Sequence, residues 1–230
     1  IRLQGTLNVQ ALERSMQEVI NRHDVLRTVF ETRNDLPIQV VKDVSLFNFT
    51  QVDLRSDLER EVKASRAVNN FAHQPFNLSQ GPLLRGILVR LEDQVYILSL
   101  TIHHIVADGW SLGILFREVA TFYEAFIEGR PSPLPPMALQ YVDYAVWQRQ
   151  WLQGPALQAH LDFWKEQLRG AKALELPGDH SRPQVRSSHG AHYAVMLPAT
   201  VRDGLHALSR QEGATLFMTL LAAFNVLLYQ

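Results

Sequence analysis

Apolar residues recur along the N-terminal part of the chain with the two periods that distinguish helices from strands. After Asn8, which can cap a helix, one apolar stripe predicts a helix; its members are Leu12, Met16, Val19 and Ile20. Residues 25–31 then alternate with the period of a strand. Asn34 and Asp35 favour a turn, and residues 37–42 predict the returning strand of a hairpin.

The middle of the chain predicts a helix, a second hairpin and a long helix. Residues 56–59 have the form of a capping box that starts the first helix. The residues expected to face inward from this helix are Leu58, Val62 and Phe71. Residues 83–91 and 95–104 predict the hairpin strands. Ser111 is expected to cap the long helix, whose stripe is Leu112, Leu115, Phe116, Val119, Tyr123 and Phe126.

The pattern of apolar residues in the C-terminal part predicts mostly helices. Residues 131–136 contain four prolines and predict a connector. Helices are predicted at 141–152, at 157–168, at 201–210 and from Thr215 onward, with one strand at 192–197. An aromatic cluster at helical spacing is more often core than binding surface, so Tyr141, Asp143 and Trp147 are expected to be packing residues.

The alternation of strands and helices indicates a mixed α/β fold. Residues 176–190 hold two prolines, two glycines and many polar side chains, which predicts a connector between two parts. We therefore expect a first lobe at 1–175, the connector at 176–190 and the start of a second lobe at 191–230. Both ends of the chain interrupt patterns, so the sequence is expected to come from a longer protein.

Composition narrows the function classes. The 230 residues are 47% hydrophobic, with a net charge of -1, so no basic field is available to hold nucleic acid. The absence of cysteine excludes a thiol nucleophile, thiolate metal sites and a disulfide framework, and it fits a cytoplasmic location. The longest apolar run is too short to span a bilayer.

Two adjacent histidines are the main candidates for chemistry. On a strand, His103 and His104 would point to opposite faces, with His104 at the end of an apolar row formed by Tyr96, Leu98, Leu100 and Ile102. Such a row would exclude water and keep an imidazole neutral, as a general base requires. Asp108 and Gly109 form a turn signal. By spacing alone, a structural role for these residues stays the commoner alternative, and no metal-ligand spacing accompanies them.

Five stretches in order resemble the condensation domains of non-ribosomal peptide synthetases. Residues 103–109, HHIVADG, resemble the HHxxxDG motif, followed by the usual Trp110-Ser111. The other four are RHDVLRTVF at 22–30, FNL through GPLLR at 76–85, YVDYAVWQ at 141–148, and FW to LP at 163–177. The family's first motif would precede Ile1 and its fifth would follow Gln230. Asp24 stands where the family pattern has Glu.

The resemblance implies a fold and a reaction. The fold would be a chloramphenicol-acetyltransferase-like two-layer lobe, a mixed sheet with flanking helices, followed by a truncated second lobe. The reaction would be peptide-bond formation, in which an acceptor amine attacks a carrier-bound donor thioester. Substrates would arrive on phosphopantetheine arms of upstream and downstream carrier domains, with an adenylation domain as neighbour. No cofactor or metal bound by the domain itself, no nucleic acid and no membrane partner is expected.

The resemblance also assigns roles to site residues. His104 would take a proton, orient the amine or stabilise the tetrahedral intermediate. Asp108 would be structural, in an ion pair with Arg22 or Arg27, so that Asp108→Ala would misfold. Gly109 would let backbone approach the thioester or serve as a plain turn glycine, and His103 would mainly support the fold. Trp110 and Ser111 would line the substrate tunnel.

Related activities are open alternatives. An epimerisation domain would use the same histidine, but that subgroup tends to read Val-Ser-Trp after the glycine, whereas this chain reads Trp110-Ser111. Heterocyclisation is disfavoured because an Asp-based motif replaces the histidines there. A coenzyme A-dependent acetyltransferase is disfavoured by the stretches at 22–30 and 141–148. A degenerate recruiting domain would usually lose the second histidine. Residues 1–230 alone are expected to be inactive and to aggregate.

Overall fold

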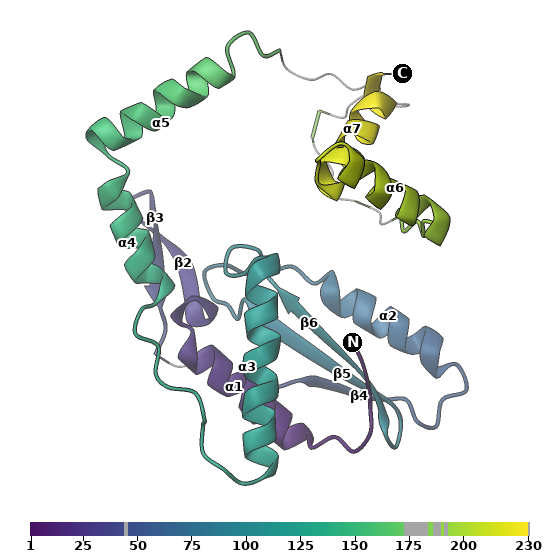
Figure 1. Ribbon diagram of the computed structural model, residues 1–230. Coiled ribbons are helices and arrows are strands. Elements are labelled where there is room, and N and C mark those ends of the chain that lie inside the picture. The colour runs from purple at the N-terminus through teal and green to yellow at the C-terminus, as the bar shows by residue number, and fades with distance from the viewer. Residues whose placement is uncertain (44–45, 173–183, 186–189, 191–192, 230) are drawn as a thin grey trace. The chain divides into compact units, whose positions relative to one another are not determined.

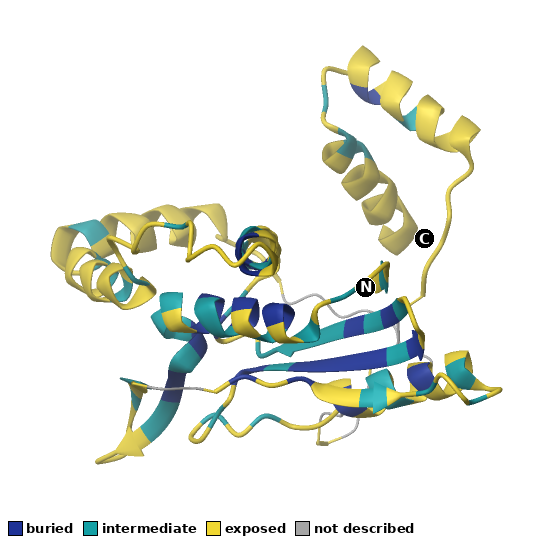
Figure 2. Cartoon of the chain, turned by 90° about the horizontal axis from the view of Figure 1, so that it is seen from below, coloured by how far each residue is buried: buried dark blue, intermediate teal, exposed yellow. Residues whose placement is uncertain are grey.

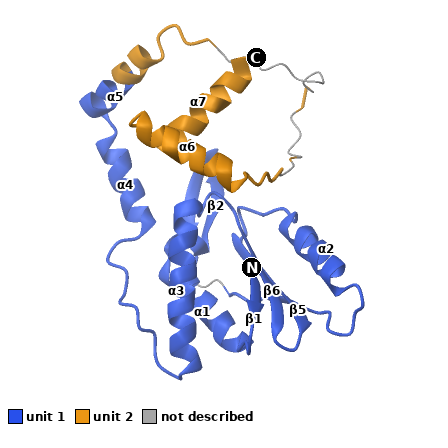
Figure 3. Ribbon diagram, turned by 45° about the vertical axis from the view of Figure 1, so that its right-hand side comes forward, with its two compact units in different colours: residues 1–161 blue, residues 162–230 orange. Residues whose placement is uncertain are grey.

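The computed structural model describes residues 1–43, 46–172, 184–185, 190 and 193–229 (Figure 1). The chain divides into two compact units, Ile1–Leu161 and Asp162–Gln230, coloured separately in Figure 3. The predicted connector at 176–190, apart from residues 184–185 and 190, lies outside the described residues. The boundary predicted after residue 175 lies there too, so it stays a prediction.

A mixed four-stranded sheet organises the first unit. Its strands are β1 (Arg2–Gln4), β4 (Thr50–Asp53), β5 (Leu84–Glu92) and β6 (Val95–Ile102). Their order is β1–β6–β5–β4. β1 and β5 run antiparallel to β6, and β4 runs parallel to β5. This arrangement confirms the mixed α/β class, and it confirms the second predicted hairpin.

The first predicted hairpin forms a separate two-stranded sheet of β2 (Thr28–Arg33) and β3 (Leu36–Val41). Asn34 and Asp35 adopt positive φ angles of 50° and 61°, as the predicted turn requires. The predicted start of the first strand is wrong, because residues 24–27 form the short 3-10 helix η1 (Asp24–Arg27). The Thr28 hydroxyl donates to the Asp24 carbonyl at 2.8 Å and so supports this turn.

Helices cover both faces of the four-stranded sheet (Figures 1 and 2). α1 (Val9–Arg22) and α3 (Gly109–Ile127) pack together on one face, and α2 (Arg60–Ala72) packs on the other. The flanking helices are confirmed, and α2 adds a second helical layer to the expected two-layer lobe. Asn8 caps α1 as predicted, since its side chain accepts from the Ala11 amide.

Strand alternation sorts the core into two clusters. Leu84, Leu88, Tyr96 and Leu98 pack with α1 and α3 in the larger cluster, and Leu100 and Ile102 pack against it. The intervening residues Ile87, Val89 and Leu91 pack with Ala64 and Phe71 of α2. The row predicted to lead to His104 therefore lies on the α1/α3 face.

The predicted start of α2 is wrong. The helix begins at Arg60 after Glu59, which makes no side-chain cap. The Asp57 carboxylate instead accepts from the Glu59 amide at 2.9 Å and from Lys63. Leu58 is fully exposed and Val62 is 51% exposed, so of the three residues predicted to face inward only Phe71 is buried.

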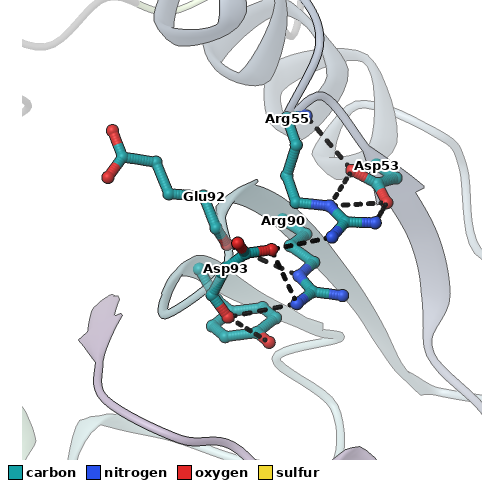
Figure 4. Close-up of polar contacts among 6 residues, drawn as sticks. Asp53, Arg55, Arg90, Glu92 and Asp93 are labelled. Carbon is teal, nitrogen blue, oxygen red and sulfur yellow. Dashed lines mark hydrogen bonds and ion pairs between the residues drawn. The ribbon is translucent and has the colours of Figure 1, made fainter.

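Polar contacts fasten β4 to the turn of the β5–β6 hairpin (Figure 4). The Arg55 guanidinium contacts the carboxylates of Asp53 and Asp93, each at 2.8 Å. Its hydrogen bonds to Asp53 lower the pKa of that carboxyl to about 2. Arg90 contacts Asp93 and lies 5.5 Å from the centre of the Tyr96 ring. These contacts stabilise the end of the sheet opposite the two histidines.

The helices after the proline-rich connector form as predicted: α4 (Tyr141–Trp151) and α5 (Gly154–Gln167). Their aromatic rings are not buried among the described residues, since Tyr141 is 58% exposed and Trp147 is 53% exposed. Trp147 stacks on Trp151 along the helix surface at a centroid distance of 5.6 Å. Asp143 accepts from the Gln140 amide at the start of α4. The predicted packing role of Tyr141 and Trp147 is therefore wrong within the described residues.

In the second unit, α6 (Ala199–Gln211) and α7 (Leu216–Tyr229) match the predicted helices. The strand predicted at 192–197 is wrong for its described part, residues 193–197, which belong to no strand. A strand needs a partner for its backbone groups, and none pairs with this segment among the described residues. No single described helix is long and apolar enough to cross a membrane, although α6 and α7, bent by 106°, pass that test as a pair.

Candidate functional site

The segment 103–109 connects the end of β6 to the start of α3. The His103 amide donates to the Leu83 carbonyl at 2.9 Å, which anchors the segment beside β5. The Val106 amide then donates to the His103 carbonyl at 3.1 Å and closes a turn. Since β6 ends at Ile102, the predicted strand is two residues too long. The segment is nevertheless held by backbone bonds at its first residue.

His104 lies in this turn and is exposed to solvent. Its imidazole has no hydrogen bond or ion pair to any other described residue, so both ring nitrogens are available to a substrate. The row Tyr96, Leu98, Leu100 and Ile102 leads toward it as expected. The expected exclusion of water is wrong for the described residues, because the row ends before the imidazole and leaves it open.

Two cavities meet at His104. The first, of about 410 Å³, extends toward α1 and α4 and is lined by apolar residues including Val19, Leu26 and Met137. The second, of about 440 Å³, extends along β6 toward Ile1. Four residues line both cavities: His104, Ala107, Asp108 and Leu112. A group seated in either cavity could therefore reach the same imidazole.

Asp108 caps α3. Its carboxylate accepts from the Ser111 amide at 2.8 Å and from the Ser111 hydroxyl at 2.6 Å. The Ser111 hydroxyl in turn accepts from the Asp108 amide, which completes a capping box. The Ser111 hydrogen bonds lower the pKa of the Asp108 carboxyl. The predicted cap at Ser111 is therefore wrong, because Ser111 occupies the third helical position and Asp108 is the capping residue.

The expected ion pair between Asp108 and an arginine is not formed. The Arg22 guanidinium contacts Glu118 of α3 at 3.1 Å and the Pro135 carbonyl. Arg27 pairs with Asp24 at 2.5 Å. Both arginines are thus occupied by partners nearer in the fold, while the Asp108 carboxylate is satisfied by the start of its own helix.

The other predicted site residues take different positions. Ser111 lines the first cavity and Gly109 lines the second. Trp110 is 84% exposed and lines neither cavity, so its expected place in a tunnel stays a prediction. His103 is half-buried and also lines neither cavity. The motif therefore divides into residues that face the cavities and residues that hold the segment in place.

Glu118 joins α3 to the end of α1 beside the first cavity, and the sequence pattern did not predict this role. One of its oxygens contacts Arg22, and the other lies 2.6 Å from Nε2 of His23. The Gln140 side chain adds a bond to the Arg22 carbonyl and one from the Asp24 amide. The signal for this role in the sequence was an acidic residue, Glu118, within a long and mostly apolar helix. Among the described residues, no group of three or more side chains could hold a metal.

Replacement of Asp108 by alanine should weaken α3 without unfolding the protein. The carboxylate caps one helix at the surface, so its loss removes a cap and leaves no buried charge. Because the folded pKa is lowered, the stabilisation is present above the ordinary pKa of about 3.9 and is lost as pH falls through the lowered value. Thermal unfolding at pH 7 should show a lower midpoint for Asp108→Ala, and Asp108→Ser should restore most of it. Aggregated Asp108→Ala would contradict this assignment.

Comparisons with known proteins identify the family of this chain. The condensation-domain family matches residues 1–230, so the chain belongs to the condensation-domain family. One component of the linear gramicidin synthase of Brevibacillus parabrevis is 48% identical over 233 residues, covering 100% of this chain and 3% of the relative. The chain spans 3–6% of the length of the first curated relatives it matches.

Solved structures show the same fold. The X-domain in its complex with OxyB from teicoplanin biosynthesis is 31% identical, with a TM-score of 0.78 over 93% of this chain and 47% of that chain. The epimerization domain from the third module of tyrocidine synthetase B is 21% identical, with a TM-score of 0.70 over 79% of this chain and 40% of that chain. The latter likeness supports the fold alone.

Proposed function

We propose that this chain forms the His104-bearing part of a domain that makes peptide bonds in non-ribosomal peptide synthesis. The observation that carries the proposal is the position of His104, whose free imidazole lies where two cavities meet. A reaction between two carrier-bound substrates needs such a meeting point. Membership of the condensation-domain family supports the same reaction class.

One histidine is enough for the two proton transfers of this reaction. The acceptor amine nitrogen attacks the donor thioester carbonyl, a C–N bond forms and the C–S bond breaks. His104 accepts a proton from the attacking nitrogen and returns one to the departing sulfur. General acid–base assistance of this kind contributes about 10²–10⁴ in rate. Holding both reactants in contact distance contributes further, because it replaces a bimolecular encounter.

The cavities fit substrates that arrive on long arms. The first cavity offers a mostly apolar wall, while the second runs along β6 toward the N-terminal strand. We expect upstream and downstream carrier domains to deliver donor and acceptor on phosphopantetheine arms, with an adenylation domain in the same synthetase. Which amino acids are joined depends on the parts of the synthetase that load those arms.

The direct test supplies the complete parent domain with two preloaded carrier domains. One carrier holds a donor acyl or peptidyl group and the other holds an acceptor amino acid. Intact-protein mass spectrometry should show the acceptor arm gaining the mass of the donor group. Inversion of the donor's α-carbon without transfer would instead identify an epimerisation domain. Release of the donor to water alone would also contradict condensation.

Gly109 provides a test of substrate approach beside His104. The residue is the first of α3, its φ angle is not positive, and nothing lies within 4 Å of where a Cβ would sit. The fold therefore accepts alanine there, but a substrate in the second cavity would meet the added methyl. Gly109→Ala should keep the unfolding midpoint and lose roughly tenfold in transfer rate. Gly113→Ala, on the same helix with open space, should leave both unchanged. Equal activity in the two variants would make Gly109 an ordinary turn residue.

A second candidate function is recruitment of a partner enzyme. The similarity to an X-domain solved in complex with OxyB favours this candidate. The open imidazole of His104 favours catalysis, since a purely recruiting surface does not require it. A domain that binds carrier domains but forms no product with several donors would favour recruitment.

A further inference from the structure

We propose that Phe76 and Arg85 are positioning residues for the reaction, acting through His103 on the segment that carries His104. This inference rests on the proposed function, because it assigns a task within the same site. His104 lines both cavities, whereas His103 lines neither. The groups around His103 are therefore free to fix the segment's conformation without contacting the substrate.

The His103 ring holds the segment 103–109 in its conformation by a hydrogen bond. Its Nδ1 accepts a hydrogen bond from the Ile105 amide at 3.0 Å. A ring nitrogen that accepts an amide proton carries no proton of its own, so the neutral ring must hold its proton on Nε2. The same residue's amide is bonded to the Leu83 carbonyl at 2.9 Å. His103 thus connects the start of the β5 region to the residue immediately after His104.

Phe76 supports the ring of His103. The two ring centroids lie 5.6 Å apart with an interplanar angle of 89°, a favourable perpendicular contact. Phe76 is half-buried and lies in the loop between α2 and β5. A smaller side chain there would leave the imidazole free to rotate about its side-chain bonds, and rotation would take Nδ1 away from the Ile105 amide.

Arg85 supports Phe76. Its guanidinium carbon lies 4.0 Å from the centre of the Phe76 ring, within cation–π range. The two terminal nitrogens donate to the Gln74 carbonyl at 2.7 Å and the Pro75 carbonyl at 3.4 Å, which hold the loop carrying Phe76. Arg85 therefore fixes both the ring and its backbone.

Arg85 places a charged side chain on an apolar face of the sheet, which is unfavourable for its guanidinium. It stands on β5 on the face of Ile87 and Val89, which is otherwise apolar. Its Nε is buried and has no hydrogen-bond partner among the described residues. Burial also lowers the pKa of the guanidinium. The guanidinium also lies 5.6 Å from the Phe71 ring, but its hydrogen bonds among the described residues go to the loop that carries Phe76.

The test compares variants of the complete domain by histidine-selective nitrogen NMR and by transfer kinetics. In the wild type, the His103 signal should be that of a neutral ring with an unprotonated Nδ1. Phe76→Leu and Arg85→Met should change that signal. They should also lower kcat by roughly tenfold to a hundredfold with little change in KM, since a displacement of about 1 Å can cost about 10²-fold. Phe76→Tyr, which keeps the ring, should restore both readouts.

Two controls separate positioning from general stability. Arg90→Met removes a comparable arginine–aromatic contact at the far end of the same strand, and it should change neither the His103 signal nor kcat. His103→Asn keeps an acceptor near the position of Nδ1 and should retain much more activity than His103→Leu. An unchanged His103 signal in both Phe76→Leu and Arg85→Met would overturn the proposal, as would equal activity of the two His103 variants. If the wild-type domain transfers nothing, the proposal of peptide-bond formation fails. The NMR comparison still decides whether Phe76 and Arg85 position His103.

Discussion

His104→Ala should reduce peptide transfer by about 10²–10⁴ while leaving the domain folded. The side chain makes no polar contact with any described residue, so its removal leaves no unsatisfied partner. The loss should appear in kcat measured with saturating loaded carriers. His73→Ala is a matched control, because that histidine is exposed at the end of α2 and its ring contacts the nearby Asn69 carbonyl. A His104→Ala domain as fast as wild type would remove His104 from the chemistry.

Gly86→Ala should destabilise the first unit more than Gly109→Ala or Gly113→Ala. A Cβ at Gly86 would lie 2.6 Å from two ring atoms of Phe49 and 2.9 Å from the Phe47 ring. Both rings are buried and contact each other edge to face, so they cannot move apart freely. Overpacking of this kind costs about 1–3 kcal/mol, and we expect the upper part of that range.

Denaturant unfolding of the complete domain measures this change in the free energy of unfolding. Gly113→Ala is the control, since its Cβ meets nothing within 4 Å. Phe49→Leu in the Gly86→Ala background should recover part of the loss, because it makes room for the methyl group. A Gly86→Ala domain as stable as wild type would mean that the aromatic pair can shift at little cost.

Periodicity predicted the elements that depend on local pattern. The cap at Asn8, the turn at Asn34 and Asp35, and the β5–β6 hairpin follow from short stretches of sequence, and the structure confirms them. The different surroundings of the two histidines were also predicted, although β6 ends at Ile102 and the turn after it, not the strand, separates them.

The pattern did not predict which of several possible partners a residue takes. Asp108 was expected to meet an arginine, but a capping box with Ser111 satisfies it locally, and Glu118 occupies Arg22. Residues 25–27 alternate as a strand yet form a 3-10 turn. The link from Arg85 through Phe76 to His103 joins a strand, a loop and a turn, and no spacing rule connects them.

Both substrates are expected to meet at His104. A crystal structure of the complete domain with a stable amide analogue of the donor thioester and an acceptor amine, each on a phosphopantetheine arm, would test this expectation. We expect the arms to occupy the two cavities on either side of the segment 103–109, with the amine about 3–3.5 Å from the donor carbonyl. A His104 ring nitrogen should lie about 2.6–3.2 Å from the amine. Reacting groups bound away from His104 would contradict the claim.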